Sequence, residues 1–160
     1  MKKQSNNSLA KMRRLLWLMG LVKIPMIAYV RPRLEHLDEK SARVKIKLRR
    51  RTRNHLKSMY FGSLAVGADV AAGLHAFYFA EGSGLKVSFA FKAVKAEFIQ
   101  RATTHVLFES NDGHLVQEAI EEAKNTGERV NKWVKVEAKN SLSEIVAIFD
   151  MEISVKIKQA

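Results

Sequence analysis

The sequence predicts an α+β fold in which an antiparallel sheet wraps around one long central helix. A run of small and apolar residues from about Tyr60 to Ala80 predicts the helix, and the breaker Gly82-Ser83-Gly84 follows it. Other segments alternate apolar with polar residues, which is the period of a half-buried strand. The order of helix, strand, long helix and then mostly strands indicates α+β architecture.

The remaining elements follow from the same patterns. Residues 8–22 predict a helix that ends before Pro25, after a polar and frayed end at residues 1–7. Residues 25–38 are expected to be irregular or to carry a short strand. Residues 115–124 predict a surface helix. Strands are predicted at residues 42–49, 92–99 (with a start as early as Val87), 105–109, 134–138 and 145–157.

Length and composition indicate one folded domain over residues 1–160. A chain of this length buries a real core, and its 47% hydrophobic and 28% charged residues are typical of a globular protein. The sequence has no cysteine, which excludes disulfides, thiolate metal sites and a cysteine nucleophile.

The formal net charge of +12 is concentrated in the N-terminal part. Residues 1–58 hold 17 Lys and Arg against three acids, whereas residues 59–160 hold 11 against 13. Such a basic surface usually meets an anion, for example a nucleic acid, a phospholipid surface or a phosphorylated small molecule.

The apolar run from Leu15 to Val22 follows a basic stretch and superficially resembles a signal peptide. Lys23 and Pro25 come next instead of a small-residue cleavage site. The stretch up to Val30 is too short for a membrane span and is interrupted by Lys23. We therefore expect a helix packed on the domain of a cytoplasmic protein, and membrane contact through an amphipathic helix is the lesser alternative.

Asp69 stands in the middle of the long apolar helix. Aspartate is a poor helix-interior residue and is rarely buried without a partner. Gly62 precedes it by seven residues, close to two turns, so both lie on one helix face, about 10 Å apart. A glycine amide at a helix start and an acid two turns later are suitable groups for attack on a carbonyl.

The spacing of Asn54, Ser58, Gly62 and Asp69 resembles the hotdog-fold acyl-CoA thioesterase superfamily, in particular its phenylacetate-pathway thioesterase-like branch. Members typically carry an Asn, a small hydroxyl residue, a glycine pair and an acid seven residues after the second glycine. The downstream stretch Glu97-Phe98-Ile99-Gln100-Arg101-Ala102 is similar to the family's strand after the helix. The resemblance implies a hotdog core at residues 25–158, with residues 1–24 as an N-terminal helical extension.

The resemblance also implies a thioester hydrolase and assigns roles by position. The backbone amide of Gly62, helped by the helix dipole, would polarise the thioester carbonyl. Asp69 would act as general base or nucleophile, and Asn54 would orient the water or bind the carbonyl. Because the sites of this fold lie between subunits, a homodimer or tetramer is implied. Substrate-binding candidates are His55, Ser58, Phe61, Ser63, Arg49, Arg51 and Arg53.

The chain departs from the family pattern at several positions. Phe61 stands where the first glycine of the pair often sits, Tyr60 replaces a histidine, Lys57 a frequent glycine and Ala102 the usual proline. The changes at Phe61 and Lys57 alter the shape of the expected thioester pocket. They favour the alternative of a non-catalytic hotdog protein that binds acyl-CoA or fatty acyl ligands.

Plainer interpretations exist for each candidate. Asp69 could be a polar group at a subunit interface, Asn54 a turn residue, and His55 a loop histidine. Ser58 and Ser63 favour helix capping, because no His/Asp arrangement is local to them. Gly67 and Gly73 favour close packing. The histidines lack metal-ligand spacing, so we expect no metal, and no cofactor beyond the coenzyme A moiety of the substrate.

The basic stripe that begins at Arg43, Lys45 and Lys47 continues through residues 49–53. A solvated strand face is its plain interpretation. Its sharper interpretation is a seat for the phosphates of coenzyme A, because guanidinium forks match phosphate oxygens. Nucleic-acid binding is a remote third alternative, since no aromatic residue interleaves the stripe.

Overall fold

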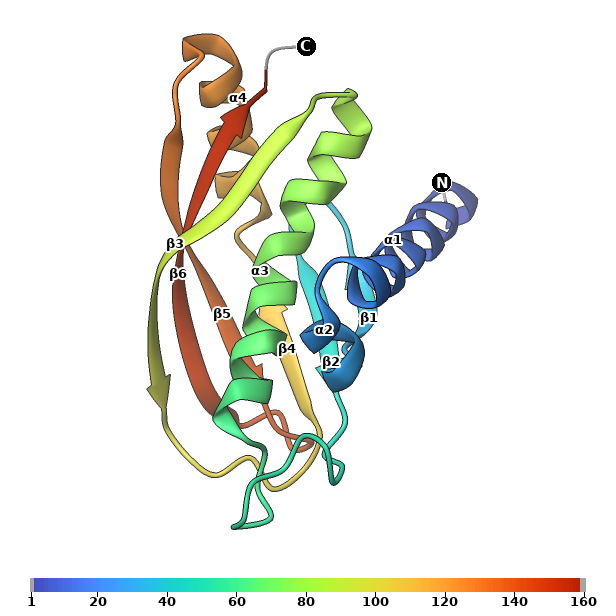
Figure 1. The fold of residues 1–160 in the computed structure, drawn as a ribbon, viewed down its shortest axis with the longest axis vertical. Coiled ribbons are helices and arrows are strands. Elements are labelled where there is room, and N and C mark those ends of the chain that lie inside the picture. Colours follow the sequence, from blue (N-terminus) through green and yellow to red (C-terminus); the bar gives the residue numbers. More distant parts are fainter. Residues whose placement is uncertain (1, 159–160) are drawn as a thin grey trace.

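The computed structural model describes residues 2–158 and shows a curved antiparallel sheet around a central helix (Figure 1). The sheet has six strands in the order β1-β2-β4-β5-β6-β3. This is the hotdog fold, and the predicted fold class is confirmed. The elements are α1 (Lys2–Val22), α2 (Pro25–Val30), β1 (Arg33–Leu37), β2 (Ala42–Ile46), α3 (Phe61–Ser83), β3 (Val87–Phe98), β4 (Val106–Ser110), α4 (Gly113–Thr126), β5 (Val130–Lys139) and β6 (Ile145–Ile157).

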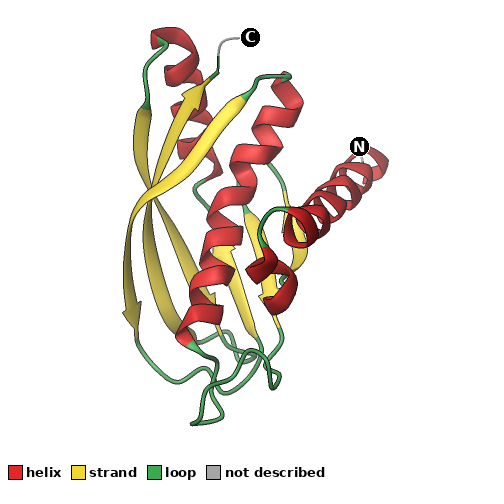
Figure 2. Cartoon of the chain, in the orientation of Figure 1, coloured by secondary structure: helices red, strands yellow, loops and turns green. Residues whose placement is uncertain are grey.

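The central helix α3 lies against the concave face of the sheet (Figure 2). It is apolar all round, and residues 71–76 form an unbroken buried run. By length and composition, Phe61–Glu81 is the one described helix that could cross a membrane, but 61% of its most apolar window is buried inside the fold. That burial is typical of the core helix of a globular domain.

Gly67 allows the close approach of α3 to the sheet. A Cβ atom at Gly67 would lie 2.3 Å from Cε2 of Phe108, a fully buried ring on β4. A Cβ at Gly73 would lie 3.6 Å from the nearest atom, in the ring of Phe89, which is ordinary contact. The structure therefore requires a glycine for packing at Gly67 but not at Gly73.

We expect Gly67→Ala to destabilise the protein by about 1–3 kcal/mol, because overpacking forces Phe108 or the helix to shift. Gly73→Ala is the matched control, and it should be neutral or up to about 1 kcal/mol stabilising, since alanine is the better helix former. Urea unfolding of the three proteins measures both values. Equal stability of the two variants would contradict this account.

The N-terminal region differs from expectation in two ways. Helix α1 begins at Lys2 instead of Ser8, because residues 2–7 contain no glycine or proline and extend a helix already nucleated behind them. Helix α2 was not expected; Pro25 begins it, and Arg31 ends it in a left-handed conformation with φ 58°. The expected short strand is present as β1.

Helix α1 is packed on the domain, as expected. Met12 and Leu16 are buried in the core. The Nε atom of Arg13 donates a hydrogen bond to the carbonyl oxygen of Leu34 in β1, at 2.8 Å. Helix α1 is therefore attached to the edge strand β1, at the end of the sheet opposite to β3.

The other elements occur where expected, with shifted bounds. Strand β5 begins at Val130 instead of Val134, because its first residues pair with the long β6. Strand β2 ends at Ile46, and α4 is longer than expected at both ends. Neighbouring strands extend such elements beyond what local alternation reveals.

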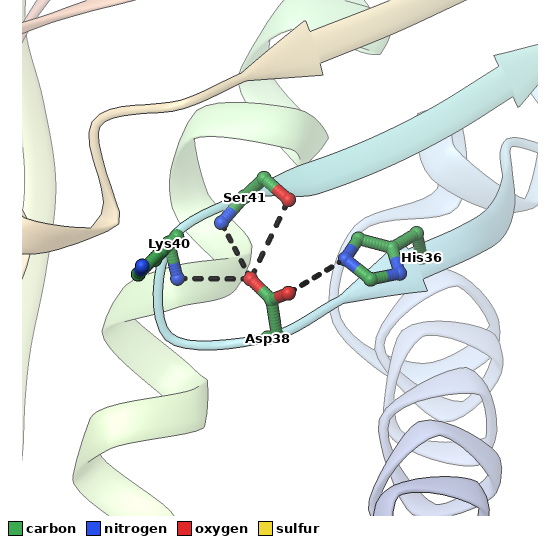
Figure 3. Close-up of polar contacts among 4 residues, drawn as sticks. All are labelled: His36, Asp38, Lys40 and Ser41. Carbon is green, nitrogen blue, oxygen red and sulfur yellow. Dashed lines mark hydrogen bonds and ion pairs between the residues drawn. The ribbon is translucent and has the colours of Figure 1, made fainter.

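The turn between β1 and β2 is organised by Asp38 (Figure 3). Its Oδ1 atom accepts hydrogen bonds from the backbone N–H groups of Ser41, at 2.7 Å, and Lys40, at 2.9 Å. His36 contacts the other carboxylate oxygen at 2.9 Å. Desolvation alone would raise the pKa of Asp38, but these hydrogen bonds and His36 outweigh it and hold the pKa below its ordinary value.

Candidate active site

Asp69 lies on α3 at the side that faces β3. Its side chain is half-buried, and it has no hydrogen-bond or ion-pair partner among the side chains that the structure describes, those of residues 9–81 and 83–158. Burial raises the pKa of the Asp69 carboxyl group, because the charged form is desolvated without compensation. An unpaired carboxylate of this kind suits proton abstraction near neutral pH.

Asp69 forms part of two hollows with mainly apolar walls. The first, of about 220 Å³, lies between α1, α2, α3 and β3, with Leu16 and Phe89 among its lining residues. The second, of about 410 Å³, lies between α3, β3 and β6, and its lining includes Phe91, Met151 and the cation Lys92. Their apolar lining can accommodate a hydrocarbon chain beside the carboxylate. Sequence reasoning missed the contribution of α2, because no local pattern shows which helix closes a groove.

The start of α3 offers a free backbone amide. Tyr60 caps the helix with an extended backbone, and its carbonyl oxygen accepts the N–H groups of Ser63, at 2.9 Å, and Leu64, at 3.1 Å. Within the described chain no acceptor takes the N–H of Gly62. The ring of Tyr60 lies over this glycine, since a Cβ there would be 2.5 Å from Cε1 of Tyr60. The amide is therefore unpaired, and the ring of an exposed tyrosine lies on the Cβ side of the same residue.

Asn54 organises the loop before α3. Its Oδ1 atom accepts hydrogen bonds from the N–H of Leu56, at 2.9 Å, and from the N–H and the hydroxyl group of Ser58, both at 3.2 Å. Lys57 adopts a left-handed conformation with φ 61°, where glycine is favoured. This geometry matches the turn interpretation of Asn54 and leaves only its Nδ2 group for a substrate.

The other candidates from this loop and helix start are divided between core and surface. Ser58 and Ser63 are buried, whereas His55 is exposed. Phe61 is 60% exposed, and its ring lies edge-on to Phe98 at the end of β3, with 6.4 Å between centroids. The structure therefore brings Phe61 toward β3, whereas Gly62 and Asp69 remain two helical turns apart, about 10 Å.

The structure also divides the basic stripe. Arg49 and Arg51 line a small hollow of about 60 Å³. Three further cations line it: Arg31, Arg33 and Lys47. Among the described residues, no carboxylate lies within ion-pair distance of these five cations. Their charges are therefore available to an anion, whereas Arg53 lies outside this hollow, in an isolated bridge to Met59.

His75 is a second buried titratable group on α3. Both of its ring nitrogens lack a hydrogen-bond partner in the described structure, and desolvation lowers its pKa. The imidazole is therefore neutral, and it stacks on Phe79 with 6.1 Å between centroids. Within residues 2–158, no group of three or more His, Asp or Glu side chains could hold a metal ion.

Solved structures with the same fold include proteins of several bacteria. A protein of unknown function from Chlorobaculum tepidum has a TM-score of 0.81 at 10% identity, covering 97% of each chain. A probable thioesterase from Pseudomonas aeruginosa has a TM-score of 0.72 at 19% sequence identity, and the match covers 91% of this chain and 95% of that one. A thioesterase from Haemophilus influenzae has a TM-score of 0.65 at 9% sequence identity, and the match covers 88% of each chain. At these identities the similarity establishes the fold.

The search of curated proteins gave no match. The family described as Domain of unknown function (DUF4442) matches residues 12–156, which is nearly the whole chain. This chain therefore belongs to the DUF4442 family.

Proposed function

We propose that this protein is a thioester hydrolase that acts on acyl-CoA substrates. The observation that carries the proposal is Asp69, a half-buried acid without a partner in the described chain, set between two apolar hollows on the central helix of a hotdog fold. Proteins of this fold from P. aeruginosa and H. influenzae, a probable thioesterase and a thioesterase, support the reaction class. Residues 1–24 would be an extension of the core whose helix completes one hollow.

In this proposal Asp69 removes a proton from water, and the water oxygen attacks the thioester carbonyl carbon. The carbonyl oxygen becomes an oxyanion, which a Gly62 amide and the dipole of α3 stabilise. When the carbon–sulfur bond breaks, the thiol leaves with the proton that Asp69 had taken. The Nδ2 group of Asn54 donates a hydrogen bond to the carbonyl oxygen or orients the water.

The separation of the two groups supports a site shared between subunits. The Gly62 amide and Asp69 of one chain are about 10 Å apart, too far to act on one carbonyl. Strand β3 is an edge strand with an unpaired side, and exposed apolar side chains gather along it and at the start of α3. They are Tyr60, Phe61, Val94, Phe98 and Ile99. We propose that a second copy pairs there, in a homodimer or in a tetramer built from such dimers.

Asp69→Asn tests the catalytic acid, because it keeps the shape of the side chain and removes the base. We expect kcat on the best of a panel of acyl-CoA substrates to fall by at least about 10²-fold. In the wild type, kcat/KM should rise with pH through a pKa above the ordinary carboxyl value, since the deprotonated form is the active one. Activity of the folded variant within a few-fold of wild type would exclude Asp69 from this role.

Stability provides the control for that variant. The pKa of Asp69 is raised in the folded state, so the stability it contributes is fully present below the unfolded pKa and is lost as pH rises through the folded pKa. At pH 7, above the unfolded pKa, the wild type therefore bears the cost of holding this carboxyl group in a desolvated place, and the variant does not. We expect Asp69→Asn to be at least as stable as wild type at pH 7 in urea unfolding, so lost activity reports lost chemistry.

The non-catalytic alternative also has support in the structure. The Tyr60 ring lies close beside Gly62, and the Oδ1 atom of Asn54 is committed to its turn. A protein that binds acyl-CoA without hydrolysis would bind the panel by calorimetry and leave every thioester intact. That result would favour the binding function.

The basic hollow predicts how coenzyme A is held. If Arg49 and Arg51, with Arg53 beside them, hold its phosphates, Arg49→Glu/Arg51→Glu should raise KM about tenfold or more, the effect of losing charged hydrogen bonds. The kcat value should stay within about twofold, because such binding is uniform along the reaction. Arg50→Glu, outside the hollow, is the control. An unchanged KM, or an equal rise with a phosphate-free N-acetylcysteamine thioester, would contradict the assignment.

The edge strand predicts the assembly. Val94→Glu/Phe98→Glu places charges on the proposed dimer surface and should weaken self-association at least about tenfold, shifting the protein toward monomer. Light scattering at micromolar concentration measures this shift, and thioesterase activity should fall with it. Leu142→Glu, in the exposed turn between β5 and β6, is the control. A monomeric wild type would contradict the shared site.

A further inference from the structure

The last two turns of α1 are apolar on every side. Residues 15–22 contain no polar side chain, although only one side of the helix packs on the domain. Leu16 is buried, whereas Trp17, Leu21 and Val22 are 63%, 54% and 75% exposed. A surface helix normally carries polar residues on its outer face. The outer face of α1 therefore requires a different explanation from its packed face.

This apolar surface continues onto α2. Seven of the fifteen large apolar side chains that are exposed in the described structure fall within residues 17–29. They are Trp17, Leu18, Leu21, Val22, Ile24, Met26 and Tyr29. Helix α1 lies at the outer margin of the fold, beside edge strand β1 (Figure 1). The proposed dimer surface consists of Tyr60, Phe61, Val94, Phe98 and Ile99, and it includes none of these seven side chains.

The charge of the same region identifies the partner. The first 34 residues contain eight Lys and Arg and no acid, and the first acid of the chain is Glu35. Exposed cations border the apolar face: Arg13, Arg14, Lys23, Arg31 and Arg33. A second copy of this face would bring like charges together, which opposes self-association. A nucleic acid would match the charge but leave the apolar side chains without a partner.

We propose that the outer face of α1 and α2 binds the surface of an anionic phospholipid membrane. Trp, Leu and Val side chains bordered by Lys and Arg are the composition of helices that lie in the membrane interface. The apolar run is far too short to span a bilayer, so the contact is peripheral. This inference rests on no catalytic step, although Arg31 and Arg33 also line the hollow proposed for coenzyme A.

A groove beneath this face is suited to lipid. It has a volume of about 830 Å³, and its wall includes the apolar Trp17, Leu21 and Ile27. Arg31 and Arg33 line both this groove and the basic hollow. Guanidinium groups bind phosphate, so these two residues suit a lipid headgroup whose acyl carbons contact the apolar wall. Glu35, the acid at the groove, lies 3.6 Å from Lys45.

The experiment uses Trp17 as its reporter. The chain has two tryptophans, so Trp133→Phe leaves Trp17 as the single tryptophan, which can be excited selectively at wavelengths that tyrosine does not absorb. Vesicles of equal parts phosphatidylglycerol and phosphatidylcholine should sediment the full-length protein and shift its emission to the blue, whereas pure phosphatidylcholine should bind it at least about tenfold more weakly. Raising the salt concentration should weaken the binding, because the charges are exposed.

Two variants and their controls decide the outcome. Leu21→Gln/Val22→Gln and Arg14→Glu/Lys23→Glu change exposed side chains only, and each should weaken vesicle binding at least about tenfold. The control for the apolar variant is Leu142→Gln, which changes a side chain of similar exposure, 76%. The control for the charge variant is Lys86→Glu/Lys158→Glu, which makes the same change in net charge. Both controls should bind vesicles like wild type. No vesicle binding, equal losses in the controls, or a changed oligomeric state in the first variant would overturn the proposal.

Discussion

The contact between Gly67 and the ring of Phe108 is the constraint on which the rest of this structure depends. It sets how closely the central helix lies on the sheet, because a single methyl group there would meet a fully buried ring. Asp69 follows two residues later, about 200° around the helix, and so lies on nearly the opposite side. The same packing that buries one face of α3 therefore leaves the acid at the open side, where β3 and the N-terminal helices form hollows.

The two main electrostatic features of the molecule are Asp69 and the basic hollow. Packing, and not ion pairing, positions both of them. Asp69 is desolvated by its neighbours without a counter-charge, so its pKa is raised. The cations of the basic hollow are grouped by the end of α2, the start of β1 and the loop after β2, without a carboxylate among its lining residues. Unpaired charges of both kinds reduce stability, and functional sites are where proteins retain such charges.

A helix or strand can be predicted from the sequence where its local residue pattern matches the face that the fold buries. The small-residue run around Gly67 identifies α3, and the alternation of residues 145–157 identifies β6, since each pattern reports the face that the fold buries. Helix α2 was missed because its start depends on Pro25 and its end on a left-handed Arg31, which tertiary contacts select. The position of the Tyr60 ring beside Gly62 depends on a side-chain rotamer, which no spacing encodes.

Spacing predicts where the candidate residues lie on α3, but not what lies opposite them. Spacing places Gly62 and Asp69 on one face of α3, and the structure keeps them there, about 10 Å apart. A closed dimer has a two-fold axis, so any contact from one copy to its partner occurs twice with the roles exchanged. If the edge strands β3 pair around such an axis, each acid can meet the helix start of the other chain, and two equal sites arise together. The open edge and the unpaired acid are then two aspects of one requirement, because neither side of the site is satisfied within a single chain.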